Sequence, residues 1–245
     1  MRILGGHLSP YVRKVLVCLD LKGIPYEIDP IVPFYGDERF AKLSPLRRVP
    51  VLLDGEVALA DSTVICEYLE DRHPEPALRP AGAADRARAR WLEEFADTRL
   101  GDVFIWRLFH QVVTRPAVFG EARDRELVER TLARDVPEVL DYLEGELPAE
   151  GFLFGSLGIA DVSIAAFFRN AAFARFAIDA VRWPRTAAFV TRVLAAAPFQ
   201  KLAELEDRLI RTPIPQHRKV LTELGVRLTE DTLFVATPRR GVMPI

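Results

Sequence analysis

The pattern of apolar and polar positions divides the first third of the chain into short alternating elements. An apolar run over residues 1–6 predicts a strand, and the apolar positions between Val12 and Leu19 then recur at helical spacing. Residues 26–31 alternate as a second strand does. Because strand, helix and strand over this length form a βαβ unit, we expect the two strands to be parallel with a right-handed crossover.

A second unit follows directly. Residues 37–43 favour a short helix, and residues 49–53 and 57–60 are β-prone runs joined by a tight turn at Asp54-Gly55-Glu56. Asp61-Ser62 then caps a third helix. The βαβ and ββα units together predict a mixed four-stranded sheet within residues 1–75.

Beyond a proline-rich connection at residues 73–82 the apolar period becomes helical and stays so. Residues 1–75 are therefore interpreted as an α/β domain and residues 83–210 as an all-α domain. Its expected helices cover residues 83–114, 121–147 with a kink at Pro137, 159–176 as a buried central helix, 183–196 and 198–210.

Composition narrows the classes of function. The chain has 245 residues, 49% of them apolar, and a formal net charge of −2, which argues against general binding to nucleic acid or to an acidic membrane. Cys18 and Cys66 lack metal-ligand spacing and are expected to be small buried hydrophobes. No metal site is expected. The start lacks a signal pattern and no apolar run is long enough to span a membrane, which favours a reducing cytoplasm.

The junction at Ser9-Pro10 is the first candidate for chemistry. Ser9 can cap the helix, and Pro10 suits the first helical position, where its missing N–H would be unpaired. Helix N-termini also favour anions, and a hydroxyl placed there can donate a hydrogen bond to a thiolate. Capping alone is the alternative role.

Four segments stand in order along the chain: Ser9-Pro10-Tyr11-Val12-Arg13-Lys14-Val15, Ser44-Pro45-Leu46-Arg47-Arg48-Val49-Pro50-Val51-Leu52, Asp61-Ser62-Thr63-Val64-Ile65, and Gly155 with Ile159-Ala160-Asp161. Together they resemble the cytosolic glutathione transferase family, in a serine-type, bacterial-like form. The resemblance spans about residues 1–210 and implies a thioredoxin-like domain followed by an all-helical domain, with glutathione as co-substrate and a homodimer.

The resemblance also implies roles for particular residues. Ser9 would activate the thiol, and a cis Val49-Pro50 bond would leave the Val49 backbone to pair with the cysteinyl part of glutathione. Asp61 and Ser62 would hold the γ-glutamyl end. The glycyl carboxylate would meet Arg48, or else Arg47 or Lys42. The alternatives are capping for Asp61-Ser62, a trans proline, and solvated surface cations.

Three departures from the family pattern stand out. His7 lies close to where other members carry a catalytic tyrosine, Arg47 stands where glycine is frequent, and Gly158 replaces a capping Ser or Thr, which leaves Asp161 to secure the helix start. Candidates for the second-substrate site, from the first-domain loops and the helix over residues 83–114, are His7, Tyr11, Phe34, Tyr35, Trp106, Arg107 and His110.

The function expected on this basis is a glutathione S-transferase that activates the glutathione thiol as thiolate for attack on an electrophilic small molecule. Enzymes of the same fold offer alternatives: a glutathione-dependent dehalogenase, isomerase or ether-cleaving lyase. A non-catalytic glutathione-transferase-like binding protein is a further alternative. A thiol-disulfide oxidoreductase is disfavoured because position 9 holds serine rather than cysteine.

Residues 211–245 lie beyond the resemblance. Thr212 to Pro215 should be extended, residues 216–224 helical, and residues 232–236 form an apolar, β-prone strip that needs to be buried. We expect this extension to pack on the helical domain and narrow the substrate cleft, with Phe234 as its main anchor. Packing on the outside of the helices, or a contact to a dimer partner, is the alternative.

Overall fold

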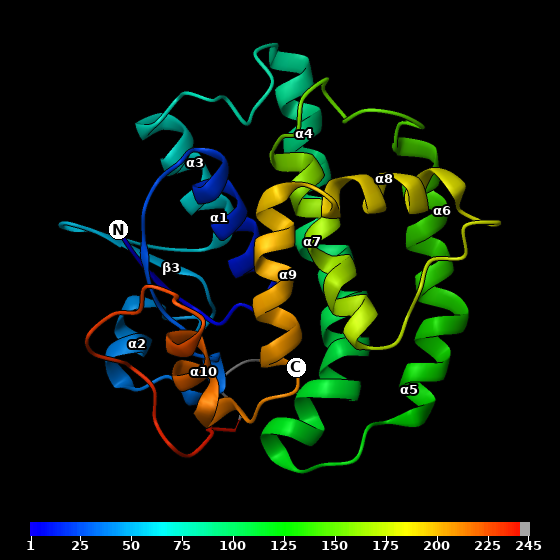
Figure 1. The fold of residues 1–245 in the computed structure, drawn as a ribbon. Coiled ribbons are helices and arrows are strands. Elements are labelled where there is room, and N and C mark those ends of the chain that lie inside the picture. The colour runs from blue at the N-terminus through cyan, green and yellow to red at the C-terminus, as the bar shows by residue number, and fades with distance from the viewer. Residues whose placement is uncertain (241–245) are drawn as a thin grey trace. The chain divides into compact units, whose positions relative to one another are not determined.

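The computed structural model describes residues 1–240 (Figure 1). The chain forms two compact units, one made of Met1–Pro76 together with the chain from Lys201 onward, the other of Ala77–Gln200. The first unit contains the sheet and the second is entirely helical. In the described part, no helix combines the length and the apolar character needed to cross a membrane.

The sheet of the first unit has the mixed topology that the sequence predicts. Its strands are β1 (Arg2–Leu4), β2 (Glu27–Asp29), β3 (Val51–Asp54) and β4 (Val57–Ala60), in the order β2-β1-β3-β4. β1 pairs with β2 in parallel and with β3 antiparallel, and β3 pairs with β4 antiparallel. The expected βαβ and ββα units are confirmed, and β2 lies at one edge of the sheet.

The register brings the ends of all four strands together at one edge. Leu4, the last residue of β1, pairs with Asp29 at the end of β2 and with Val51 at the start of β3. Val51 in turn pairs with Ala60 at the end of β4. The segments that leave β1, β2 and β4 and the segment that enters β3 therefore lie next to one another.

Helices α1 (Pro10–Leu21), α2 (Glu38–Leu43) and α3 (Ser62–Arg72) and a 3-10 turn, η1 (Pro33–Tyr35), complete the expected thioredoxin-like domain. Two cations of α1 are buried. Lys14 Nζ donates to Thr63 Oγ1 at 2.9 Å, and Arg13 Nε pairs with Glu206 Oε1 at 2.5 Å. The first contact ties α1 to α3, and the second ties α1 to the helix α9 (Ala197–Leu209).

The second unit contains α4 (Ala83–Phe95), η2 (Ala96–Phe119), α5 (Arg125–Arg130), η3 (Thr131–Asp135), α6 (Val136–Glu146), α7 (Ile159–Phe173) and α8 (Pro184–Leu194). The helix expected to stop at residue 114 continues as a π-type helix through Pro116. It ends at Gly120, whose φ of 66° is left-handed, as at many helix C-termini. The next helix begins at residue 125 rather than at the expected residue 121, because Asp124 is its N-cap.

The start of α7 explains the glycine at position 158. A Cβ at Gly158 would lie 2.7 Å from the Leu78 carbonyl oxygen, so only glycine fits this close approach. The carboxylate of Asp161 replaces the missing side-chain cap, accepting from the backbone N–H of Gly158 and of Leu153 at 2.9 Å each. The predicted role of Asp161 is confirmed.

The extension requires a correction. After α9 it forms η4 (Ile214–Gln216) and α10 (His217–Glu223), and its described part belongs to the first unit and pairs with it. Leu228 forms a parallel bridge with Ile28 of β2, and Phe234 an antiparallel bridge with Gly36. The physical reason is that an edge strand offers unpaired backbone groups, which a helical domain does not. Residues 241–245 of the predicted extension lie outside the described residues.

Candidate functional site

Ser9 is the N-cap of α1. Its φ and ψ of −80° and 128° are relaxed, and its Oγ accepts the backbone N–H of Val12 at a long 3.4 Å. The capping role expected from the sequence is confirmed. Because Oγ acts here as an acceptor, its own proton remains available for a bond to an anion at the helix N-terminus.

His7, two residues earlier, is 1% exposed, and neither ring nitrogen has a hydrogen-bond partner within residues 1–240. Burial, helped by the neighbouring His217 and Arg13, lowers the pKa of His7 to about 4. The imidazole is therefore neutral near pH 7 and contributes no full positive charge to the Ser9 turn.

The cis bond at Val49-Pro50, implied by the family resemblance, is confirmed. Val49 lies against the turn that leads to Ser9: a Cβ added at Gly5 would come within 3.1 Å of the Val49 Cβ and 2.5 Å of a Val12 methyl. Gly5 has a φ of +151°, which side chains rarely adopt, so glycine is needed on both counts. Within residues 1–240 the backbone of Val49 makes no hydrogen bond, which leaves it available to a ligand.

The turn before Val49 carries two arginines. Arg47 has a φ of 50°, so it holds the left-handed conformation that glycine adopts at no steric cost. Its Nη2 lies 3.4 Å from Glu38, whereas Arg48 and Lys42 are exposed. The Ser44 hydroxyl locks the turn: it donates to the Arg48 carbonyl at 2.8 Å and accepts the Arg48 N–H at 3.0 Å.

Asp61 and Ser62 begin α3. Asp61 accepts the backbone N–H of Thr63 at 2.9 Å and of Val64 at 3.2 Å, and it has an unfavourable φ of 91°. Strain of this kind costs about 1–3 kcal/mol and is concentrated at functional sites. Ser62 is 2% exposed, and over residues 1–240 its Oγ has no hydrogen-bond partner. A buried free hydroxyl beside a helix N-terminus suits a carboxylate ligand.

The aromatic candidates of the first unit are mostly covered. Phe34 and Tyr35 are each 5% exposed, and the Tyr35 ring stacks on Phe234 with centroids 5.0 Å apart. Burial raises the pKa of Tyr35. Tyr11 is half-buried on the first turn of α1. The structure thus gives the Tyr35 ring a stacking partner in the extension.

The candidates on η2 form a group of their own in the second unit. Trp106 is half-buried, with its ring 6.2 Å from that of His110. Arg107 is held by Asp102 and Asp135, at 3.0 and 3.1 Å. His110 is buried, and burial next to Arg115 lowers its pKa. Arg107 is therefore committed to ion pairs, while the Nδ1 of His110 has no hydrogen-bond partner among the described residues.

The first unit thus assembles Ser9, Val49, Asp61 and Ser62 at one edge of the sheet, with Arg47 and Arg48 on the adjoining turn. Sequence reasoning missed Asp29, a buried carboxylate at the same edge that binds the extension. An acidic residue ending an apolar strand was the available signal. Residues 1–240 contain no group of three or more His, Cys, Asp or Glu placed to hold a metal ion.

Comparison with known proteins agrees with this geometry. Residues 5–77 match the model of the glutathione S-transferase N-terminal domain. The chain is 32% identical over 167 residues to the uncharacterized GST-like protein YibF of Escherichia coli, covering 67% of this chain and 79% of that protein. It is 31% identical over 171 residues to glutathione S-transferase U8 of Arabidopsis thaliana, covering 69% and 70% of the two chains.

Among solved structures, a glutathione S-transferase from Rhodospirillum rubrum F11 aligns with a TM-score of 0.75 at 28% identity, covering 82% of this chain and 90% of that one. Some matches are shorter: the 40% identity to glutathione S-transferase Z2 of Arabidopsis thaliana is confined to 82 residues, 37% of that protein. The long matches run through both units. The chain belongs to the glutathione S-transferase family.

Proposed function

We propose that this protein is a glutathione-dependent transferase in which Ser9 stabilises the glutathione thiolate for attack on an electrophilic small molecule. The observation that carries the proposal is the placement of a spare hydroxyl donor, an unpaired Val49 backbone and the buried Ser62 hydroxyl at one edge of the sheet in a member of this family.

The chemical step needs a thiolate, because the neutral thiol is a poor nucleophile. A free thiol has a pKa of about 8.5, so only a small fraction is ionised near pH 7. A hydrogen bond from Ser9 and the partial positive charge at the N-terminus of α1 both favour the anion and lower that pKa. The thiol proton leaves to solvent, the sulfur forms a bond to the electrophilic carbon, and the leaving group departs with its electron pair.

Binding would use the remaining groups of the edge. The Val49 N–H and C=O pair with the cysteinyl backbone in the manner of an added strand. The Ser62 hydroxyl and the N-terminus of α3 receive the γ-glutamyl carboxylate, and Asp61 meets the ammonium group. Arg47 or Arg48 receives the glycyl carboxylate. His7 is neutral at this pH, so the serine rather than a cation at position 7 carries the activation.

The test is a pH titration of thiolate absorbance in the glutathione complex, followed by turnover of a panel of electrophiles. We expect the bound thiol to ionise about one or two pH units below free glutathione, and Ser9→Ala to abolish most of that shift. The panel should include halogenated, unsaturated and aryl-ether substrates, which separate transferase from dehalogenase, isomerase and lyase activity. A bound thiol that titrates as free glutathione does would contradict the proposal.

The second substrate is assigned, in the same proposal, to Trp106 and His110 of the helical unit, because the two rings are neighbours and the Nδ1 of His110 has no partner among the described residues. We also propose a homodimer in a reducing cytoplasm, as expected for the family. Sedimentation equilibrium at micromolar concentration checks the dimer.

A further inference from the structure

The described end of the extension, residues 227–239, forms a segment that we call the strap. It begins beside β2, where the Ile28 N–H donates to the Arg227 carbonyl at 3.0 Å and the Thr229 N–H donates to the Ile28 carbonyl at 3.2 Å. These bonds occupy the free side of an edge strand. In Figure 1 the orange and red end of the chain runs past α10, close to α2.

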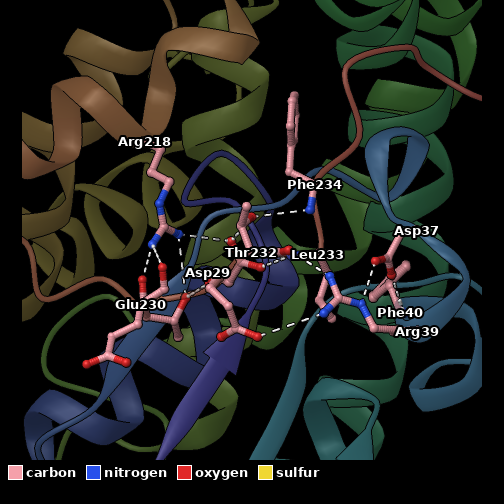
Figure 2. Close-up of polar contacts among 11 residues, drawn as sticks. Asp29, Asp37, Arg39, Phe40, Arg218, Glu230, Thr232, Leu233 and Phe234 are labelled. Atoms are coloured by element: carbon pink, nitrogen blue, oxygen red, sulfur yellow. Dashed lines mark hydrogen bonds and ion pairs between the residues drawn. The ribbon is translucent and has the colours of Figure 1, made fainter.

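Asp29 is the anchor of the strap (Figure 2). Its side chain is 2% exposed, and both carboxylate oxygens accept hydrogen bonds. Oδ1 accepts the Thr232 hydroxyl at 2.7 Å and lies 3.4 Å from Arg218, while Oδ2 accepts the Leu233 N–H at 2.7 Å. Burial raises the pKa of this carboxyl, and the donors from the strap oppose the rise. Loss of this carboxylate would leave the donors of Thr232 and Leu233 without their acceptor.

The same residue also holds the Ser9 turn through its backbone. The Asp29 carbonyl accepts the Gly5 N–H at 2.9 Å, and Gly5 stands four residues before Ser9. Asp29 is thus a junction: its main chain fixes the end of β1, and its side chain fixes the strap.

The strap in turn fixes the segment from Phe34 to Arg39. Three backbone bonds join them: Val235 N–H to Tyr35 at 2.7 Å, Asp37 N–H to Leu233 at 2.9 Å, and Arg239 N–H to Phe34 at 2.8 Å. The Arg39 guanidinium adds a bond to the Thr232 carbonyl at 3.0 Å, and Phe234 stacks on Tyr35. The segment is therefore bound along its whole length.

This segment leads into the cationic end of the site. Asp37 caps the start of α2, and the helix is followed by Ser44, whose hydroxyl locks the backbone of Arg48. Arg239 of the strap also pairs with Glu38, the acid that faces Arg47. The orientation of both arginines thus depends on where the strap holds α2.

We propose that Asp29 is a positioning residue for glutathione: by anchoring the strap it holds α2 and the Arg47-Arg48 turn where the glycyl carboxylate binds. This inference rests on the proposed function. It makes the extension a determinant of co-substrate affinity, through the glycyl end alone.

The variant Asp29→Asn is the sharpest probe. The amide keeps the size of the side chain but replaces one acceptor by a donor, so one buried donor of the strap or of Arg218 always faces an NH₂ group. Thr232→Val is the milder second variant, which removes one donor. Glu230→Gln is the matched control, because it removes a charge from the same turn while its exposed side chain contacts none of these groups.

The measurement compares glutathione with γ-glutamylcysteine, which lacks the glycine. For Asp29→Asn we expect the KM for glutathione to rise about tenfold, the worth of one charge-assisted hydrogen bond, with kcat at saturation unchanged. The KM for γ-glutamylcysteine should stay within about twofold, because that ligand never used the cations. Thr232→Val should also raise the KM for glutathione but not that for γ-glutamylcysteine, by a smaller factor. Glu230→Gln should behave as the wild type.

Amide hydrogen exchange tests the anchor without any ligand. Exchange should rise at Leu233, Val235 and Asp37 in Asp29→Asn while the amides of β3 and β4 stay protected. Faster exchange at Leu233 with Asp37 unchanged would overturn the inference, as would equal losses of affinity for the two thiols. Wild-type protein that binds neither thiol, with exchange as expected, would contradict the proposed function and leave the strap as a purely structural anchor.

Discussion

The two helix N-termini that meet at the sheet edge are capped in different ways. At α1, Ser9 caps with a relaxed backbone and one long bond of 3.4 Å. At α3, Asp61 caps with bonds of 2.9 and 3.2 Å and a strained φ of 91°. The Ser9 hydroxyl at α1 keeps its proton for a ligand. At α3 the Asp61 carboxylate is already bonded to the backbone, and the hydroxyl without a partner among the described residues is that of Ser62.

This difference in capping assigns the two termini different roles: the α1 terminus acts on the chemical step, and the α3 terminus acts on glutathione binding. A loosely used hydroxyl can turn toward a charge that forms during the reaction, and so it acts on turnover. A rigid, strained turn cannot change during the reaction and presents the same donors to the ground state and the transition state, so it acts on affinity. Substitutions at the two termini should therefore change different kinetic constants.

Ser9→Ala should give the largest effect. Loss of a hydrogen bond to a charged sulfur is worth about 1.5–3 kcal/mol, so kcat should fall between about 10- and 100-fold, while the KM for glutathione changes little. Steady-state kinetics at pH 7 measure this. Ser9→Thr keeps a hydroxyl and should retain most of the activity. Unchanged turnover in Ser9→Ala would transfer activation to His7 or Tyr11.

His7→Phe tests whether the α1 terminus lacks a cation. The folded pKa of His7, about 4, lies below its ordinary value of 6.5, so the unfolded chain binds the extra proton first as pH falls. The free energy of unfolding should therefore drop by about 2 kcal/mol between pH 7 and pH 5 because of this residue. His7→Phe should remove that share in urea titrations at the two pH values. An equal drop in both proteins would show that His7 binds its proton equally well in the folded and the unfolded chain.

Asp61→Asn isolates the charge at α3. Asparagine caps as well as aspartate, so the helix start should survive and stability should change by under about 1 kcal/mol. The lost partner for the glutathione ammonium should raise the KM about fivefold to tenfold with kcat unchanged, by the worth of a charge-assisted bond. Calorimetric titration with glutathione gives the affinity directly. A fall in kcat at saturating glutathione would erase the distinction between the two termini.

Ser62→Ala should give the smallest effect. Its hydroxyl has no partner among the residues described, so folding loses nothing and the protein should be as stable as the wild type or slightly more so. Glutathione affinity should fall about threefold to tenfold, as for one hydrogen bond to a carboxylate. Thermal unfolding with and without glutathione separates the two effects. A clear loss of stability in the absence of ligand would make Ser62 a structural residue.

Much of the first unit, and the start of α7 in the second unit, could be predicted from local pattern. Strand and helix periods gave the mixed sheet, Ser9-Pro10 gave the start of α1, and Asp161 gave the cap of α7. These features depend on residues a few positions apart, so the information lies within each segment. The ends of η2 and α5 were less well predicted, because a wide helix tolerates Pro116 and a left-handed Gly120 ends it.

The candidate site was only partly predictable, because only some of its features depend on residues a few positions apart. The residue types at Ser9, Val49 and Asp61 follow from motif spacing, but the strain at Asp61, the left-handed Arg47 and the neutral state of His7 do not. Each depends on how closely another part of the chain approaches, and a single sequence does not record those distances.

By itself, the sequence determined which segments are strands and helices, and that residues 232–236 need burial. It did not determine where. Only the tertiary structure decided that the strap binds β2 and η1, because an edge strand, the buried carboxylate of Asp29 and the Tyr35 ring together satisfy its donors and its apolar side chains. Burial is demanded locally, but the surface that provides it is assembled from segments about 200 residues away along the chain, as the separation of 203 between Asp29 and Thr232 illustrates.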